Sequence, residues 1–350
     1  MNQHQSVQSA TSSTRSRDEL RDDAHRAKAL WGALATLAAG AILWRRAQTY
    51  RRDLAQLELE LPASAPLDQN ERLLIIAPHP DDEVLATGAL IHQARAQNCA
   101  VRVVFLTNGD GSGSAYLAQH AREGRRPSFQ QLAQTRQNEA LAALRELGIE
   151  AQDAIFLGYP DGGLGAMSRE NFNCDTPYFS KWTNGTEVPY LNALSVGASY
   201  AGENVVRDLV QVCEEFTPTR VYTTEENDTH ADHVAAFEFT QRALQQWRET
   251  SPSETSSTRS EARPRFFTTL IHHHIWPVPH GLHLDSPLCP PAILSYLNWT
   301  HFAVDHETLK TKQRALRCYK SQLVWTPLYL RSFLRRTELF REIEISEPRA

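Results

Sequence analysis

From about residue 70 onward, short continuous apolar runs alternate with longer stretches of helical spacing. A continuous apolar run is typical of a strand buried on both faces, and helices between such strands cover the two faces of a parallel sheet. The pattern therefore predicts an α/β fold with a mostly parallel sheet, helices on both faces and reactive groups at the carboxyl ends of the strands. The expected strands are 73–77, 101–107, 154–157, 220–223 and 266–271, and the expected helices lie near 83–97, 128–147, 202–216 and 230–247.

The residues before this pattern differ in composition. Residues 1–27 are rich in Ser, Gln, Arg and Asp and almost lack large apolar side chains, which predicts a disordered tail. Residues 28–46 contain the uncharged run ALWGALATLAAGAILW, for which we expect a hydrophobic helix that anchors the chain in a membrane. A signal segment and a buried or interfacial helix are the alternatives. Residues 47–69 are expected to form a charged helix and a linker, and the catalytic domain to cover residues 70–345.

Composition argues against two classes of protein. The five cysteines are odd in number and show no CxxC spacing, so they predict neither a disulfide framework nor a thiolate zinc site. The net charge of −5 at pH 7 is mild, and no long basic cluster occurs in the main body. We therefore expect no nucleic-acid partner.

The sequence APHPDDE, residues 77–83, directly follows the first expected strand. It places His79, Asp82 and two more acidic residues at the carboxyl end of that strand, and imidazole and carboxylate groups are good zinc ligands. The alternative is an ordinary helix N-terminus, in which Asp82 and Glu83 complement the helix dipole and Asp81 is the cap.

The sequence HADH, residues 230–233, follows a later expected strand in the same way. His230 and His233 are three residues apart and would share one face of a helix. Taken alone, a chance or structural pair is an equal alternative. The two groups at strand ends reinforce each other, and together they predict a metal site.

With these residues, the chain resembles the LmbE/PIG-L family of zinc-dependent deacetylases, which includes N-acetylglucosaminyl-phosphatidylinositol de-N-acetylase and the MshB and BshB enzymes. Residues 77–83 are similar to the family's AHPDDE signature with one extra proline, and residues 230–233 are similar to its H-x-D-H signature. The resemblance implies a Rossmann-like sheet. It extends over residues 70–345 through weaker matches: TNGD at 107–110, Arg136 with Glu139, YPDGGL at 159–164, and the stretch 310–322.

The resemblance implies that His79, Asp82 and His233 bind Zn²⁺, with another divalent metal such as Fe²⁺ as the alternative. Zinc lowers the pKa of a bound water to about 7 and polarises an amide carbonyl. The resemblance further implies that Asp81 is the general base that takes the proton of this water.

For the other motif residues, the resemblance implies roles around the substrate. His230 would be the acid or the oxyanion stabiliser, oriented by Asp232, and Arg136 and Asp161 would contact the substrate. Asp110 would bound the cleft.

The run of three histidines at 272–274 ends an expected strand. Alternate residues of an extended chain point to opposite faces, so the three side chains cannot all bind one metal ion. We expect a structural or surface role for these histidines. The alternative is that one of them lines the cleft.

The implied activity is that of a metal-dependent N-deacetylase, an amide hydrolase acting on linear amides. It would remove the N-acetyl group of an N-acetylglucosamine-type small molecule or glycolipid. A lipid-linked substrate of the N-acetylglucosaminyl-phosphatidylinositol kind would suit a single-pass membrane protein whose catalytic domain faces the cytoplasm. The alternatives are a deacetylase of a soluble glycoside or secondary metabolite, a zinc phosphoesterase, and a catalytically silent membrane-bound metal-binding scaffold. The sequence leaves the oligomeric state open.

Overall fold

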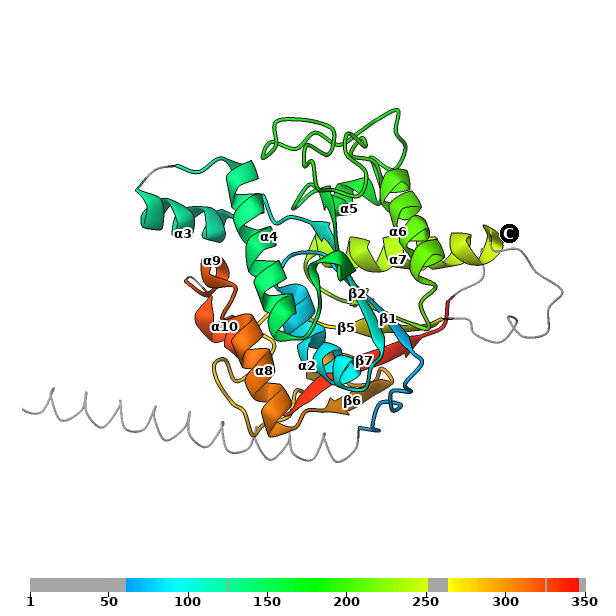
Figure 1. Cartoon of the computed structure of the whole chain (residues 1–350), viewed down its shortest axis with the longest axis vertical. Helices are drawn as coiled ribbons and strands as arrows, with labels where there is room; N and C mark the ends of the chain where they lie inside the picture. The colour runs from blue at the N-terminus through cyan, green and yellow to red at the C-terminus, as the bar shows by residue number, and fades with distance from the viewer. Residues whose placement is uncertain (1–60, 125, 251–263, 325, 346–350) are drawn as a thin grey trace, which may run out of the picture. The chain divides into compact units, whose positions relative to one another are not determined.

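The computed structural model describes residues 61–124, 126–250, 264–324 and 326–345. These residues contain seven strands: β1 (Arg72–Ala77), β2 (Ala100–Thr107), β3 (Ala154–Tyr159), β4 (Arg220–Thr224), β5 (Arg265–Thr269), β6 (Trp299–Ala303) and β7 (Thr337–Ile343). They form one sheet in the order β3-β2-β1-β4-β5-β7-β6 (Figure 1). Strands β1 to β5 are parallel to one another, whereas β7 is antiparallel to both β5 and β6.

The sequence of β1, RLLIIA, explains its place inside the sheet. Leu73 and Ile75 point to one face and Leu74 and Ile76 to the other, and each of the four is at most 2% exposed. The first pair belongs to one hydrophobic core and the second pair to another. A strand that is apolar on both faces has to be covered on both.

Helices supply this cover on the two faces. Helices α2, α4 and α8 pack together on one face, and α5, α6 and α7 pack together on the other (Figure 1). The helices of the described residues are α2 (Asp82–Ala96), α3 (Gly113–Glu123), α4 (Phe129–Glu146), α5 (Leu164–Met167), α6 (Gly202–Phe216), α7 (Ala231–Thr250), α8 (His306–Leu316), α9 (Lys320–Leu323) and α10 (Pro327–Arg331), with short 3₁₀ turns at Ala151–Asp153 and Ala292–Leu294.

The order of the strands reverses at β1. Strands β2 and β3 lie on one side of β1, and β4 and β5 lie on the other. In an open α/β sheet, the crevice at the carboxyl ends of the strands on the two sides of such a reversal is where ligands bind. The loops that follow β1 and β4 flank this crevice, and they contain residues 78–81 and 225–230.

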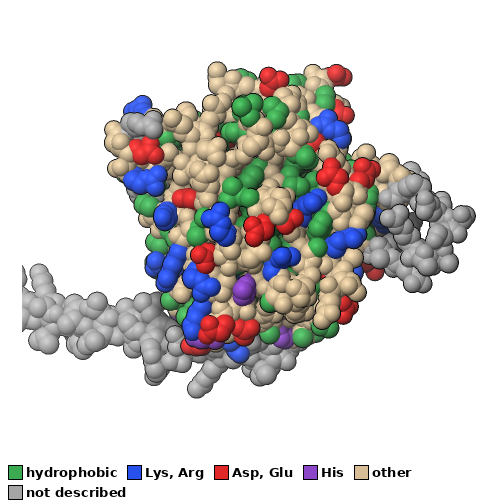
Figure 2. All heavy atoms as spheres, in the orientation of Figure 1, with side chains coloured by type: hydrophobic (Ala, Val, Ile, Leu, Met, Phe, Trp, Pro, Cys, Tyr) green, Lys and Arg blue, Asp and Glu red, His purple; other side chains and the backbone are tan. Residues whose placement is uncertain are grey.

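Both charge signs occur on the surface. On the face shown in Figure 2, Lys and Arg side chains gather over α3 and α8 with acidic side chains among them. Exposed ion pairs of the described residues include Arg314 with Glu146 at 3.0 Å and Lys310 with Glu307 at 2.9 Å. Exposed pairs of this kind contribute little to stability.

The expected α/β class and mostly parallel sheet are confirmed, and the five expected strands correspond to β1 to β5. The sequence pattern does not predict β6 and β7. Strand β7 could not be recognised as a continuous apolar run, because Glu338 and Arg341 interrupt its apolar residues. In the fold, the charges of these two residues are paired. The expected N-terminal hydrophobic helix lies outside the described residues.

The expected membrane localisation needs correction. Among the described residues, no helix combines the length and the apolar composition that crossing a bilayer requires. The longest, α7 and α4, have 20 and 18 residues and carry charged side chains along their length. The single-pass anchor assigned to residues 28–46 is therefore not supported by any described helix, and that segment itself lies outside the described residues.

Candidate active site

Two chain segments bring three side chains together at the crevice. His79 follows β1, Asp82 begins α2, and His233 lies in the first turn of α7 after β4. His79 Nδ1 lies 3.2 Å from Asp82 Oδ2 and 3.3 Å from His233 Nε2, and His233 Nε2 lies 3.2 Å from Asp82 Oδ2. All three residues are buried. The three expected metal ligands therefore form a nearly equilateral triangle of ligand atoms, which we call the ligand triangle.

The dimensions of the ligand triangle suit a tetrahedral metal ion. Zinc bonds of about 2.0–2.2 Å to nitrogen and oxygen place neighbouring ligand atoms of a tetrahedron about 3.3–3.6 Å apart. The observed separations of 3.2 and 3.3 Å are close to this range. Three protein ligands also leave a fourth position for water or substrate, as catalytic zinc sites do.

The outward-facing nitrogens of both imidazoles contact carboxylates. His79 Nε2 lies 3.1 Å from Asp232 Oδ2, and His233 Nδ1 lies 3.1 Å from Asp228 Oδ2. Because a carboxylate only accepts hydrogen bonds, each ring donates outward and can present a lone pair to the ligand triangle. Together with Asp82, three electron-pair donors then face one point. Such an arrangement can hold a cation, and imidazole and carboxylate are donor groups that zinc accepts.

The electrostatics of the two imidazoles agree with a cation site. Burial alone would lower their pKa values. Neighbouring carboxylates, led by Asp161, instead raise the pKa of His79 well above its ordinary value. Carboxylates led by Asp82 raise the pKa of His233 to about 10. The metal-free site thus attracts positive charge, which protons provide and which a metal ion would replace.

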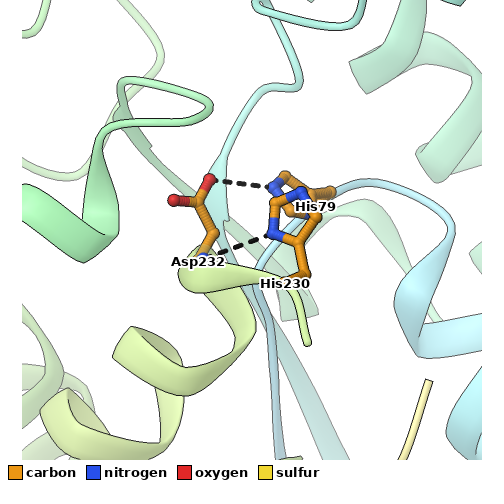
Figure 3. A group of neighbouring side chains, drawn as sticks. All are labelled: His79, His230 and Asp232. Carbon is orange, nitrogen blue, oxygen red and sulfur yellow. Dashed lines mark hydrogen bonds and ion pairs between the residues drawn. The ribbon is translucent and has the colours of Figure 1, made fainter. Parts of the chain in front are cut away.

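Asp232 holds His79 and the loop after β3 in one position. Its Oδ2 accepts hydrogen bonds from His79 at 3.1 Å and from the N–H of Gly162 at 2.7 Å, and its Oδ1 accepts the N–H of Leu164 at 3.0 Å. Its contact with His230 is made by the backbone, because the Asp232 N–H donates to His230 Nδ1 at 3.2 Å (Figure 3). The Asp232 carboxylate therefore orients His79, whereas we expected it to orient His230.

The same backbone contact defines the protonation of His230. Since Nδ1 accepts a hydrogen bond, neutral His230 carries its proton on Nε2 and is a donor there. Burial, followed by the charges of His79 and His233, lowers the pKa of His230. His79, His230 and Asp232 form a second group that could hold a metal, but the Asp232 carboxylate already accepts three hydrogen bonds. The ligand triangle is the better metal site.

Asp81 occupies the N-cap position of α2 but makes no capping hydrogen bond with its side chain. Its φ of 123° lies in a region that favours glycine and costs other residues about 1–3 kcal/mol. Burial, opposed by the charge of Arg136, raises the pKa of the Asp81 carboxyl to about 7. The interpretation of Asp81 as an ordinary helix cap therefore fails. Its carboxyl lies outside the ligand triangle, although it is next to Asp82 in the chain.

Glu83 and Tyr319 hold the strained backbone of Asp81. Glu83 Oε2 accepts the N–H of Asp81 at 3.1 Å, and Glu83 Oε1 accepts the hydroxyl of Tyr319. Both side chains are buried, and burial raises the pKa of Glu83 to about 8. Glu83 therefore links the start of α2 to the segment before α9. This contact goes beyond the expected role of Glu83, which was to complement the helix dipole.

Arg136 reaches from α4 to the same backbone. Its Nη2 donates to the carbonyl of Pro80 at 2.6 Å and its Nη1 to that of Gly109 at 3.1 Å. The guanidinium also lies 3.6 Å from Asp81 and 3.8 Å from Asp161. A Cβ on Gly109 would meet Arg136 Nη1 at 1.9 Å, so this approach requires glycine. Arg136 therefore supports the loop and balances two carboxylates.

The two other residues expected to contact or border the substrate are Asp161 and Asp110, and only Asp161 contacts His79. Asp161 Oδ1 is 3.4 Å from His79 Nε2, and the charge of His79 overcomes the effect of burial and lowers the pKa of Asp161 to about 2. Asp110 is fully buried and accepts the N–H of Asp161 at 3.1 Å and the hydroxyl of Tyr190 at 2.6 Å. Asp161 thus borders the ligand triangle, whereas Asp110 supports Asp161.

His272 is the member of the histidine run that reaches the site. Its ring centroid lies 4.8 Å from that of His233 and 5.4 Å from that of His230. Its backbone N–H donates to Asp228 Oδ2 at 2.8 Å. The rings of His273 and His274 contact each other instead. One histidine of the three thus lies at the crevice.

Sequence reasoning missed Asp228 and the pairing of Glu83 with Tyr319. Asp228 lies two residues before the HADH motif, and an acidic residue that close to a ligand histidine was an available signal. No local signal exists for the pairing, because its members are 236 residues apart.

Comparison with known proteins agrees with the motifs. The PIG-L family model, described as GlcNAc-PI de-N-acetylase, matches residues 74–244. A curated 1D-myo-inositol 2-acetamido-2-deoxy-alpha-D-glucopyranoside deacetylase from Acidothermus cellulolyticus is 31% identical over 179 residues, 51% of this chain and 54% of that protein. The corresponding deacetylase from Kribbella flavida is 30% identical over 171 residues, 48% and 51% of the two chains. The chain thus spans about half the length of the curated relatives it matches.

Solved structures overlap more of the chain at lower identity. An N,N'-diacetylchitobiose deacetylase from Pyrococcus horikoshii is 18% identical, with a TM-score of 0.46 and coverage of 85% of this chain and 92% of that one. A 4-carboxy-2-hydroxymuconate hydratase from Pseudomonas putida is 16% identical, with a TM-score of 0.49 and coverage of 80% and 100%. Likeness at this level carries no argument about the reaction. On the motifs and the family match, residues 74–244 of this chain form a PIG-L (LmbE) family domain.

Proposed function

We propose that this protein is a metal-dependent deacetylase that hydrolyses the N-acetyl group of an N-acetylglucosamine-type substrate. The observation that carries the proposal is the ligand triangle with a carboxyl outside it, that of Asp81, directly next to Asp82 in the chain. The curated relatives are named as deacetylases of an acetamido sugar linked to inositol, which supports the substrate class.

His79, Asp82 and His233 would hold the metal, with Zn²⁺ as the first choice and Fe²⁺ as the alternative. When bound, zinc supplies Lewis acidity, which activates a water and polarises the amide carbonyl of the substrate. Asp232 and Asp228 keep the two imidazoles in the ligating tautomer by accepting their outward protons.

Asp81 is the proposed general base. Its carboxyl has no capping task, and the hydrogen bond from its N–H to Glu83 fixes its position beside Asp82. It would take the proton of the attacking water and return a proton to the amine that leaves. Arg136, 3.6 Å away, would stabilise the charged form of Asp81 before it takes the proton and again after it has returned it.

His230 is the proposed oxyanion stabiliser. Its Nε2 proton is available because Nδ1 is occupied by the N–H of Asp232. A donor aimed at the carbonyl oxygen stabilises the negative charge that develops there when the amide is attacked. Asp161, which borders the ligand triangle, is the proposed contact to the polar groups of the sugar.

A panel of acetylated sugars tests the function. The metal-loaded protein is incubated with N-acetylglucosamine, N,N'-diacetylchitobiose, the inositol glycoside of N-acetylglucosamine and a lipid-linked form, and acetate and free amine are quantified. We expect equimolar acetate and amine from at least one substrate. A protein that binds metal without releasing acetate from any of them would be a silent scaffold, and turnover of a phosphodiester instead would indicate a phosphoesterase.

A further inference from the structure

His272 carries a hydrogen bond that the proposed chemistry does not use. The residue follows β5, whereas His79 follows β1, and β4 lies between these two strands. His272 is partly exposed. Its Nδ1 lies 2.9 Å from the hydroxyl of Tyr329, and the two rings are stacked with an angle of 6° between their planes. The hydroxyl of Tyr329 also donates to the carbonyl of Ile271 at 2.7 Å.

These two contacts define the tautomer of His272. A phenol has one proton, and the carbonyl of Ile271 can only accept it. For the 2.9 Å contact to be a hydrogen bond as well, His272 Nδ1 has to donate to the hydroxyl oxygen. Neutral His272 therefore carries its proton on Nδ1 and a lone pair on Nε2.

The lone pair of His272 Nε2 is available to a ligand. Within residues 61–124, 126–250, 264–324 and 326–345, no hydrogen-bond partner of this atom exists. The atom is also absent from the buried polar atoms that lack partners, so solvent reaches it. His272 belongs to neither of the groups among the described residues that could hold a metal. When neutral, His272 thus offers a lone pair beside His230 and His233 that none of the described residues uses.

We propose that His272 Nε2 accepts a hydrogen bond from the substrate hydroxyl on the carbon next to the one that bears the acetamido group. This makes His272 a specificity-determining residue, and it rests on the proposed function. The acetamido group has to reach the ligand triangle for hydrolysis. The ring of His272 lies only 4.8 Å from that of His233, so it meets the neighbouring part of the sugar. In a 2-acetamido glycoside, the free hydroxyl adjacent to the acetamido carbon is the one on C3.

The other residues nearby do not offer the same contact. Neutral His230 is a donor at Nε2, because its Nδ1 accepts the N–H of Asp232. Asp228 already accepts hydrogen bonds from His233 and from the backbone of Ile271 and His272. On the His233 side of the site, His272 Nε2 therefore supplies an acceptor to which no described residue donates.

The test combines substrate analogues with variants. The best acetamido sugar of the panel is compared with its 3-deoxy analogue on the wild-type protein and on His272→Gln, His272→Asn and His274→Asn. Glutamine places its amide oxygen where Nε2 lies, whereas asparagine reaches only the position of Nδ1. His274, two residues away, is exposed and has a φ of 51°, which asparagine tolerates, so it is the matched control.

We expect the wild-type protein to prefer the hydroxylated substrate by about 3- to 10-fold in kcat/KM, the effect of one neutral hydrogen bond. His272→Gln and His274→Asn should keep this preference, and His272→Asn should lose it. The change should appear mainly in KM, because the bond exists in both ground and transition states. A preference that survives in His272→Asn, or its absence in the wild-type protein, overturns the inference.

A spectroscopic measurement needs no variant. In ¹⁵N–¹H spectra of the metal-loaded protein, the proton of His272 should reside on Nδ1, and a proton on Nε2 would contradict the proposal. Failure of the proposed function is separable from failure of this inference. A wild-type protein that deacetylates no acetamido sugar overturns both, whereas an active protein with no 3-hydroxyl preference overturns the role of His272 alone.

Discussion

Two adjacent aspartates at the start of α2 have different surroundings. Asp82 Oδ2 accepts the N–H of His79 at 3.0 Å and faces both imidazoles of the ligand triangle. Asp81 has a positive φ, which its neighbours enforce, and its carboxylate has Arg136 as an ionic contact at 3.6 Å. The change of backbone direction at Asp81 separates the two carboxylates, and of the two only that of Asp82 belongs to the ligand triangle.

Replacing Asp81 separates catalysis from metal binding. Asp81→Asn keeps the shape of the side chain but removes its basicity, so we expect unchanged metal content and a fall in kcat of about 10²- to 10⁴-fold. Metal content by elemental analysis and turnover of the best substrate are the measurements. His79→Ala is the comparison, because it should lose the metal and the activity together. Full activity of Asp81→Asn would remove Asp81 from the mechanism.

Asp228 should control metal affinity without touching the metal. Its Oδ2 accepts the proton of His233 Nδ1 and two backbone N–H groups. Asp228→Asn weakens this support of His233, and loss of such a partner lowers metal affinity by about 10- to 100-fold. Competition with a chromophoric chelator measures the affinity. Asp305→Asn, at the N-cap of α8, is the control, and equal affinities of the two variants would refute the role of Asp228.

At the scale of elements, a buried ion pair joins α2, α8 and β7. Lys312 Nζ lies 2.6 Å from Glu338 Oε1 and donates to the carbonyl of Leu85 at 2.9 Å. Glu338 also accepts the N–H groups of Ala89 and Leu90 in the middle of α2. Helix α2 is therefore fastened to two elements near the end of the chain, and this contact positions the helix that begins with Asp82.

Breaking this pair should be costly. The side chains of Lys312 and Glu338 are 1% and 0% exposed, and removing one member of such a pair leaves an uncompensated buried charge. We expect Lys312→Met to lower the free energy of unfolding by about 3–5 kcal/mol in denaturant titrations. Lys310→Met is the matched control on the same helix, since Lys310 pairs with Glu307 at the surface. A loss no larger than that of the control would contradict the importance of the buried pair.

At the scale of the molecule, the ligand triangle joins the two sides of the sheet reversal. His79 and Asp82 come from the β1–α2 connection, and His233 comes from the β4–α7 connection. An ion held by both connections binds the folded chain only, since unfolding separates the ligands. Metal binding and folding stability should therefore be linked.

Removal of metal should lower the melting temperature. At a free metal concentration of 100 times Kd, one site that exists only in the folded state adds about 2.7 kcal/mol to stability. Thermal unfolding of the protein after chelation, and again after addition of Zn²⁺, measures the effect. Asp82→Ala lacks one ligand and should show no metal-dependent shift. A melting temperature of the wild-type protein that does not change with Zn²⁺, or a shift of the same size in Asp82→Ala, would argue against the site.

Within the site, the sequence predicted the groups that are local in the chain. The spacing of His79 and Asp82, and of His230 and His233, is set by one turn of backbone, so the motif places each pair before any tertiary contact forms. Their position at strand ends follows from the apolar runs before them. The protein contacts of Asp232 and Arg136 could not be predicted, because which group a side chain contacts depends on neighbours from other elements.

By itself, the sequence determined the α/β class, the five parallel strands and the two motif groups, because strand burial, helix spacing and short motifs are encoded within one or two turns of chain. Only the tertiary structure decided the antiparallel edge β7–β6, the pairing of Glu83 with Tyr319, and the approach of His272 to His233. These features join residues far apart in the chain. Their partners are selected by packing and by the need to satisfy buried polar groups, and no local pattern records that choice.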